Sequence, residues 1–270
     1  MKNLKYSQLD AQAGWVASTR EKFQASDDPN AVTSVFVHGN QIDAGAARDW
    51  VGPAVYHSLV RQAPSPRPLR FVIWSWPSER TDARALEDVR IKADRTNREG
   101  YFLARVLDEH DPRVQTSVVG YSYGARIIDG ALHLLGGGKL AGYSLPTRVH
   151  PERIAFRVVD IAAAEDNDWL LPGHRLGKAL SQDEKLLNLF NSCDLALNHY
   201  HLLYGRRCCQ EALGCTGLAG IQALGPDRGK IAQYDACCIV GREHNWELYF
   251  GSPALVARMA PYVFFEDQGP

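Results

Sequence analysis

Short apolar runs alternate with longer amphipathic stretches along this chain, and this alternation constrains the fold more than any other feature of the sequence. The apolar runs place Val, Ile, Leu and Phe at consecutive positions, which is typical of strands buried on both faces of a parallel sheet. Strands that alternate with helices require crossover connections, so the sequence predicts an α/β fold with a mostly parallel central sheet and helices on both faces. The predicted strands begin at Thr33, Leu69, Thr116, Ile154, Lys185 and Ile231, the last one covering IAQYDACCIV, and the predicted helices cover residues 44–61, residues 82–110 and the segment after Ser122.

The whole chain is expected to form one domain. Its 270 residues, 45% hydrophobic and 23% charged, suit a single α/β unit with a sizeable core. No repeat, linker or low-complexity tract divides residues 1–270. Residues 1–31 hold little strand pattern and are predicted to form an N-terminal arm or helix. Residues 195–230 are rich in Leu, Tyr and Cys and are the candidate for a partial lid.

Charge and hydropathy exclude several classes of protein. Lys and Arg total 30 against 31 Asp and Glu, which gives a formal net charge of −1. Such a balance lacks the basic surface of a dedicated nucleic-acid or anionic-membrane binder. No apolar run reaches the roughly 18–20 residues of a membrane span, and the first residues lack the apolar core of a signal peptide. We therefore expect a cytoplasmic protein that acts on a small molecule, with no nucleic-acid partner and no membrane span.

A G-x-S-x-G motif, Gly120-Tyr121-Ser122-Tyr123-Gly124, lies between a predicted strand and a predicted helix. In this context the motif is typical of a nucleophile elbow, where glycines remove clashes beside a strained turn and leave the serine hydroxyl exposed. Ser122 is therefore the candidate nucleophile. The backbone N–H of Tyr123 is a candidate oxyanion donor at the start of the helix. The alternative is an ordinary strand-to-helix turn.

A second motif, VFVHGN, ends the first predicted strand. Gly39 allows a tight turn beside the nucleophile, and the N–H of Asn40 is the candidate for the second oxyanion donor. His38 is interpreted as a residue that braces this loop rather than as a base.

Several segments together resemble a known family. VFVHGN, FVIWSWPS, REGYFLARVL, VVGYSYGARI, NSCD and REHNWELYF follow one another between Val32 and Phe250. With these segments the chain resembles the α/β-hydrolase fold superfamily, and within it a bacterial branch of uncharacterised serine hydrolases. The resemblance implies a single α/β-hydrolase domain. It also implies reduced N-terminal strands, because residues 1–31 have little strand pattern, and no large cap, because residues 164–184 are too short for one.

The same resemblance orders the catalytic residues as serine, acid and histidine. His244 lies in the loop after the last predicted strand, at the end of the sheet where Ser122 is expected, and is the candidate base. Asp194 follows the fifth predicted strand and is the favoured acid, with Asp166 as the alternative. Asp194 also suits an N-cap of the next helical segment.

Four aromatic or apolar residues, Tyr121, Trp76, Trp169 and Leu170, are candidates for a substrate-binding surface, with core packing as the alternative for each. No P-loop, dinucleotide-binding glycine motif or zinc-protease helix motif is present, so no cofactor and no metal are expected.

The six cysteines all lie in the last third of the chain. Cys208, Cys209 and Cys215 lack the C-x2-C spacing of a structural zinc site. Free thiols are the expected state, because a domain of this size needs no disulfide staple. A disulfide between Cys193 and the Cys237-Cys238 pair stays open, because these residues fall on neighbouring predicted strands.

The sequence thus favours a serine hydrolase that cleaves an ester, thioester or amide through an acyl-enzyme on Ser122. The alternatives are a non-catalytic protein that uses the same fold to bind a ligand, and a redox- or metal-responsive module built on the cysteines. The acyl group, the leaving group and the oligomeric state are not determined by the sequence.

Overall fold

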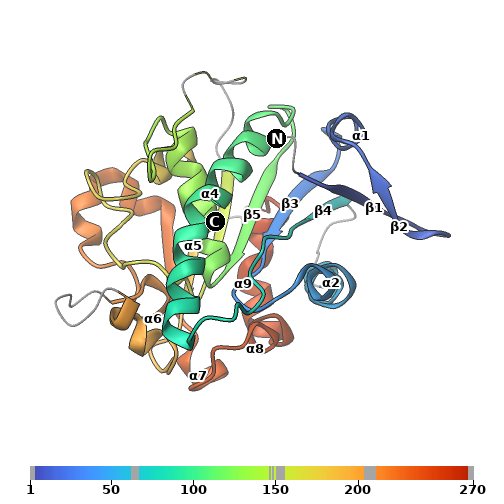
Figure 1. Cartoon of the computed structure of the whole chain (residues 1–270). Coiled ribbons are helices and arrows are strands. Elements are labelled where there is room, and N and C mark those ends of the chain that lie inside the picture. Colours follow the sequence, from blue (N-terminus) through green and yellow to red (C-terminus); the bar gives the residue numbers. More distant parts are fainter. Residues whose placement is uncertain are drawn as a thin grey trace.

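A six-stranded parallel sheet organises the computed structural model (Figure 1). The structure describes residues 4–61, 67–145, 147, 149, 156–203 and 211–266. The strand order is β4-β3-β5-β6-β7-β8, and every neighbouring pair is parallel. The predicted α/β class with a parallel central sheet is therefore confirmed. The strands are β3 (Val32–Val37), β4 (Leu69–Trp74), β5 (Thr116–Tyr121), β6 (Phe156–Ile161), β7 (Asp183–Phe190) and β8 (Ile231–Asp235).

Helices cover both faces of this sheet (Figure 1). The long helix α4 crosses α5 on one face, while α9 lies on the other face behind β5, β6 and β7. Eight of the helical segments have the bounds α1 (Arg20–Ala25), α2 (Ala44–Ala46), α3 (Gly52–Val60), α4 (Ala85–Asp108), α5 (Tyr123–Leu135), α7 (Cys237–Val240), α8 (Trp246–Gly251) and α9 (Pro253–Val263). The π-helical turn η1 (Ala47–Val51) joins α2 to α3. Within the described parts of the chain, no helix is long and apolar enough to cross a bilayer.

The order of the strands reverses beside β3. From β3 the chain passes to β4 on one side and then returns to β5 on the other side. The loops after β3 and β5 therefore leave the sheet at the position where its strand order reverses, which is where ligands commonly bind in sheets of this kind.

The connection after β6 is short and irregular, whereas the connection after β7 is longer and contains several short helical segments. Residues 164–182 consist of turns and the 3₁₀ helix η2 (Ala179–Gln182), so the absence of a large cap at this position agrees with the expected fold. The candidate lid over residues 195–230 contains η3 (Leu197–Leu203), α6 (Leu213–Thr216) and η4 (Ile221–Lys230). Residues 204–210 of that segment, including Cys208 and Cys209, lie outside the described residues.

The N-terminal segment differs from the expected arm or helix. Two strands, β1 (Tyr6–Asp10) and β2 (Gly14–Ser18), form an antiparallel hairpin apart from the main sheet, and α1 follows. The Asp10 carboxylate accepts hydrogen bonds from the N–H groups of Gln12 (2.9 Å) and Ala13 (2.8 Å), and Gly14 adopts φ +71°. This turn chemistry fixes the hairpin. The hairpin was missed because its mostly exposed residues show no apolar alternation.

The last predicted strand, IAQYDACCIV, extends five residues beyond the strand in the structure. The strand β8 ends at Asp235, and Cys237 begins the short helix α7. The Asp235 carboxylate accepts the N–H of Cys237 at 2.9 Å, and the N–H of Ala236 donates to the carbonyl of Phe190 at 2.8 Å. The ladder ends here because the carboxylate takes the next backbone donor. Cys237 and Cys238 therefore do not lie on a strand.

Three carboxyl groups meet in the core beneath the active-site end of the sheet. Asp129 on α5, Asp160 on β6 and Glu165 after β6 have no measurable exposure. Burial raises the pKa of all three groups, and the pKa values of Asp129 and Asp160 rise well above that of an ordinary Asp. Burial favours the protonated form of each group, because an ionised carboxylate is costly inside a protein.

This cluster predicts that the fold loses stability as the pH rises. A carboxyl with a raised pKa in the folded state contributes fully below its unfolded pKa, and its contribution falls as the pH rises toward the folded value. The free energy of unfolding should drop by up to about 1.4 kcal/mol per pH unit for each such group. Urea unfolding at pH 5 and pH 8 measures this slope. Asp160→Asn should reduce the slope, whereas the exposed control Asp49→Asn should not; equal slopes in all three proteins would contradict the prediction.

Candidate active site

Ser122 occupies the sharp turn between β5 and α5. Its backbone lies at φ 56° and ψ −118°, a region that non-glycine residues rarely adopt. Hydrogen bonds hold this conformation: the N–H of Ser122 donates to the carbonyl of Ile161 (2.8 Å), and its own carbonyl accepts from Ala125 (3.2 Å) and Ala164 (3.2 Å). The turn is therefore fixed from both β6 and α5.

The two glycines of the motif are required by close contacts. A Cβ at Gly124 would overlap the carbonyl oxygen of Val37 on β3. A Cβ at Gly120 would lie 2.5 Å from the backbone nitrogen of Ala125. Any larger residue would push α5 away from the sheet, so the motif's spacing is a packing requirement of this elbow.

The strain at Ser122 predicts an unusual order of stabilities. Glycine adopts positive φ without a steric penalty, while alanine retains the clash of its Cβ. We expect Ser122→Gly to be more stable than Ser122→Ala by about 1 kcal/mol, despite the greater flexibility of glycine in the unfolded chain. Denaturant unfolding of the two variants measures the difference, and a less stable glycine variant would show that the turn is unstrained.

His244 joins Ser122 to Asp194. Its Nε2 lies 2.9 Å from Oγ of Ser122, and its Nδ1 lies 2.6 Å from Oδ2 of Asp194. The Asp194 side chain is fully buried, while the imidazole keeps 20% of its exposure. When the proton of His244 is on Nδ1, the Asp194 carboxylate accepts a hydrogen bond from Nδ1–H, which leaves Nε2 free to take the proton of the Ser122 hydroxyl. The structure thus brings together the three residues that the sequence singled out from three different loops.

The second oxygen of Asp194 orders the loop that carries it. Oδ1 accepts the N–H groups of Ala196 and Leu197, each at 2.9 Å, at the start of η3. The sequence suggests two roles for Asp194, the acid beside His244 and the N-cap of the following helical segment. The structure accommodates both, because Oδ2 contacts His244 while Oδ1 accepts the two backbone N–H groups.

Asp166 has a different partner. Its Oδ1 accepts the hydroxyl of Tyr200 at 2.8 Å, and burial raises the pKa of this carboxyl. Among the described contacts, His244 pairs with Asp194 and not with Asp166.

The loop after β3 lies against the nucleophile. A Cβ at Gly39 would be 3.1 Å from Cβ of Ser122, which places this loop beside the serine. The Asn40 side chain turns back to accept the N–H of Gln41 at 3.0 Å, and that of Ser78 binds both backbone groups of Ile42. Asn40 directly follows Gly39 in this loop, and Tyr123 directly follows Ser122 at the start of α5. Their role as oxyanion donors stays a prediction.

His38 supports this loop from the core. Its Nδ1 lies 2.9 Å from the carbonyl of Gly39, and its Nε2 accepts the N–H of Trp76 at 3.3 Å. Burial lowers the pKa of His38 to about 4, so the ring is neutral near pH 7. His38 therefore braces the turn, as the sequence indicated.

The four candidate substrate-binding residues are all buried. Tyr121 packs its ring 5.3 Å from that of His244, and the indole N–H of Trp76 donates to the carbonyl of His38. The guanidinium groups of Arg126 and Arg175 lie over the ring of Trp169, 4.7 Å and 4.6 Å from its centroid. These contacts are those of supporting residues, so a direct contact of Tyr121, Trp76, Trp169 or Leu170 with a substrate stays a prediction.

Ser122 itself is only 4% exposed, because His244 and the Gly39 turn pack against it. The sequence predicted a more open hydroxyl.

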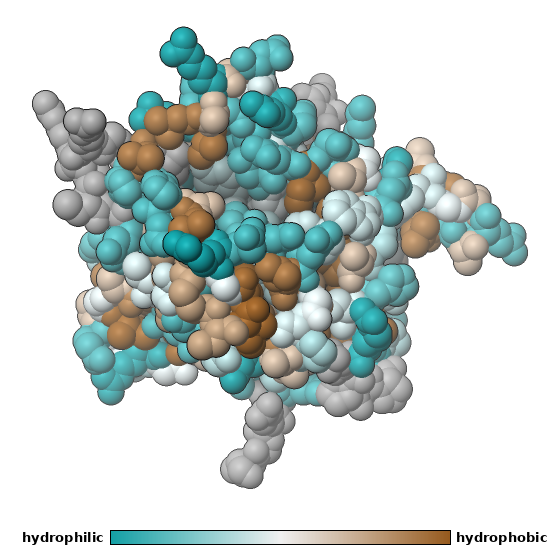
Figure 2. Space-filling model, turned by 90° about the horizontal axis from the view of Figure 1, so that it is seen from below, coloured by the Kyte–Doolittle hydropathy of each residue, from teal (hydrophilic) through white to brown (hydrophobic). Residues whose placement is uncertain are grey.

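Apolar side chains gather near the middle of the face shown in Figure 2. Exposed apolar residues that follow the carboxyl ends of strands include Trp50, Leu195, Ile239 and Leu248.

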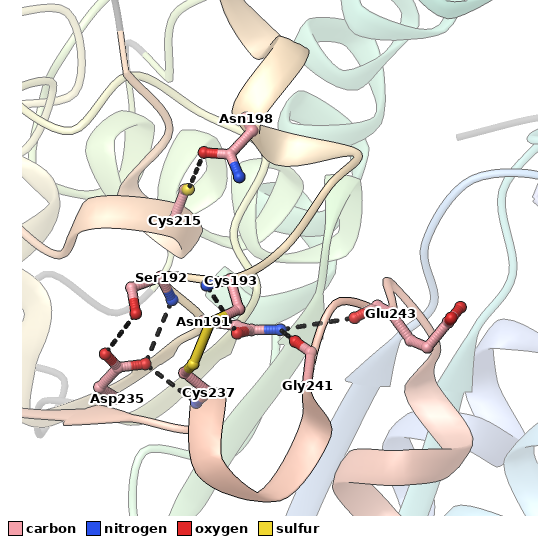
Figure 3. The surroundings of a disulfide bond; sticks show 9 residues. All are labelled: Asn191, Ser192, Cys193, Asn198, Cys215, Asp235, Cys237, Gly241 and Glu243. Atoms are coloured by element: carbon pink, nitrogen blue, oxygen red, sulfur yellow. Dashed lines mark hydrogen bonds between the residues drawn. A yellow bond between two sulfur atoms is a disulfide. The ribbon is translucent and has the colours of Figure 1, made fainter.

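A disulfide joins Cys193 to Cys237 beside this site (Figure 3). Cys215 is a buried free thiol and Cys238 an exposed one. The expectation of free thiols is therefore wrong for one pair. Sequence reasoning left this pairing open and missed its neighbours Asn191 and Asp235. The available signal was the position of Cys193, directly before Asp194.

Comparisons with known proteins give only distant likenesses. No protein-family model matches the chain, and no curated protein matches it significantly. A solved structure described as "the putative cell surface hydrolase from Lactobacillus plantarum WCFS1" shares 10% identity, covers 89% of this chain and 94% of its own, and has a TM-score of 0.47. A cutinase-like protein from Cryptococcus sp. shares 13% identity, covers 85% and 91%, and has a TM-score of 0.35. Neither likeness assigns a family or function to this chain.

Proposed function

We propose that this protein is a serine hydrolase that cleaves an ester, thioester or amide through an acyl-enzyme on Ser122. The observation that carries the proposal is the continuous hydrogen-bonded chain from Ser122 through His244 to the buried Asp194. A protein that only binds a ligand has no need for a strained serine aligned with an imidazole and a carboxylate.

The geometry supports the following roles. His244 Nε2 takes the proton as Oγ of Ser122 attacks the carbonyl carbon of the substrate, and later gives it to the leaving group. Asp194 holds the imidazole and offsets the positive charge that forms on it. The N–H groups of Asn40 and Tyr123 stabilise the oxyanion, helped by the positive end of the α5 dipole. Water then releases the acyl group by the same steps.

The compartment in which the enzyme acts is also part of the proposal. The sequence favoured the cytoplasm, but disulfides persist chiefly in oxidising surroundings. The Cys193–Cys237 bond therefore favours a secreted, periplasmic or otherwise oxidising location.

A burst experiment tests the proposed route. Rapid mixing of the protein with p-nitrophenyl acetate should release about one equivalent of p-nitrophenol per Ser122 before the slower steady state, which is the signature of an acyl-enzyme whose hydrolysis limits turnover. A steady state without a burst, together with no trapped acyl group at acid quench, would contradict the acyl-enzyme. No release above the buffer rate would contradict a hydrolase of such esters.

The limited access to Ser122 predicts a preference for short acyl groups. Each methylene adds only about 0.8 kcal/mol, and only where the pocket accepts it. We expect kcat/KM to stop rising early in a series of p-nitrophenyl esters from C2 to C16. A continuous rise to C16, with activation at a lipid interface, would instead show that residues 195–230 form a lid that opens.

A further inference from the structure

We propose that the Cys193–Cys237 disulfide is a positioning bond of the active site, which holds Asp194 in register with His244, and that its reduction lowers turnover. The kinetic part of this inference rests on the proposed function. The geometric part, the alignment of Asp194 and His244, does not.

The disulfide connects the two loops that carry the acid and the histidine (Figure 3). Cys193 directly precedes Asp194 in the loop after β7. Cys237 begins α7, the short helix that leads from β8 to the loop of His244. The bond therefore closes a ring that runs through both partners of the 2.6 Å contact between Asp194 and His244.

The remaining links between these loops are hydrogen bonds. The buried Asn191 amide donates to the carbonyls of Gly241 (2.8 Å) and Glu243 (3.4 Å). On the outside, the hydroxyl of Ser192 donates to Asp235 at 2.6 Å, where both residues are exposed. The N–H of Leu195, directly after Asp194, also donates to the carbonyl of Arg242 at 3.2 Å. Water competes with the exposed pair of Ser192 and Asp235, so without the disulfide the acid loop is tied to the histidine loop, among the described contacts, mainly by the hydrogen bonds of Asn191 and Leu195.

Cys193 and Cys237 are each half-buried, so a small reductant can reach the bond. A dithiol reduces it by thiol–disulfide exchange: the dithiol loses two electrons and two protons and closes its own disulfide, and Cys193 and Cys237 each gain one electron and one proton. The products are two cysteine thiols. The reverse exchange with an oxidised dithiol restores the bond. An enzyme governed in this way is fully active only in oxidising surroundings.

The effect on turnover follows from the precision that proton transfer requires. A displacement of about 1 Å in a catalytic group can cost about 100-fold in rate. We expect reduction with dithiothreitol, or the double change Cys193→Ser with Cys237→Ser, to lower kcat about 10- to 100-fold with little change in KM. Cys238→Ser is the matched control, because this neighbouring thiol is exposed and free. It should keep full activity and full sensitivity to dithiothreitol.

Two readouts separate positioning from a general loss of stability. The first is the low-field proton resonance of the His244 Nδ1–H bonded to Asp194, recorded in folded samples without substrate. It should be sharp in the oxidised protein and broadened or lost in the reduced one. The second is a double-perturbation cycle that compares the effect of reduction in the wild type and in Asp194→Asn. In Asp194→Asn, reduction should change the residual kcat by less than about twofold, since the contact between the Asp194 carboxylate and His244 is already lost.

The outcomes distinguish this inference from the proposed function. Loss of the resonance on reduction supports the positioning bond even if no ester is hydrolysed. An unchanged resonance in the folded reduced protein, or an unchanged kcat in an enzyme that hydrolyses esters, overturns it. Equal losses of kcat in Asp194→Asn and wild type on reduction would also overturn it, because the disulfide would then act elsewhere.

Discussion

Ser122→Ala is expected to lower the turnover of short p-nitrophenyl esters by about 10⁴- to 10⁶-fold, because removal of the nucleophile leaves only the catalysis supplied by binding and by the oxyanion donors. The backbone at Ser122 is held from β6 and α5, so the fold should survive. Steady-state kinetics measure the loss, and far-UV circular dichroism checks the fold.

A serine far from the site provides the control for this change. Ser181 lies exposed in η2, and Ser181→Ala should keep the wild-type rate. If Ser122→Ala retains more than about a tenth of the activity while folded, Ser122 does not act as the nucleophile.

Asp194→Asn should be nearly as damaging, with an expected loss of about 10⁴-fold in kcat. The asparagine oxygen can still accept the N–H groups of Ala196 and Leu197, so the loop should stay ordered. The amide nitrogen then faces Nδ1 of His244 and donates to it, which forces the tautomer with the proton on Nε2. That imidazole cannot take the proton from Ser122.

Asp166→Asn is the matched comparison for the acid. An amide oxygen at this position can still accept the hydroxyl of Tyr200, and the contact to His244 is untouched. We expect a change in kcat of less than about fivefold, measured under the same conditions. A larger loss in Asp166→Asn than in Asp194→Asn would place the acid after β6 instead of after β7.

Features of the fold with strong local patterns could be predicted from the sequence. The apolar runs of β3, β5 and β6 are buried along their whole length, so composition alone marks them. The hairpin of β1 and β2 could not be found in this way, because a side chain of its turn, Asp10, fixes it and its faces are mostly exposed. The end of β8 depends likewise on one carboxylate, Asp235, that captures a backbone donor.

The candidate site likewise has a part that the sequence predicts and a part that it does not. Ser122, Asp194 and His244 follow the ends of predicted strands, which converge at one edge of the sheet. This position, together with the G-x-S-x-G motif and the order serine, acid, histidine, selects them and leaves Asp166 as the alternative acid. The contacts that hold these three residues in place form only in the folded structure and could not be predicted. Neither the pairing of Cys193 with Cys237 nor the reach of Asn191 to Gly241 has a periodic signal, because each joins loops that only the folded sheet brings together.

The most direct test of the central claim is covalent labelling with a fluorophosphonate, followed by peptide mapping of the modified residue. The probe reacts with a serine only when a neighbouring base activates it. The proposed function predicts one adduct per chain, on Ser122, with labelling abolished in Ser122→Ala and greatly slowed in His244→Ala. Absence of labelling in the oxidised wild-type protein, or an adduct on a serine other than Ser122, would contradict it.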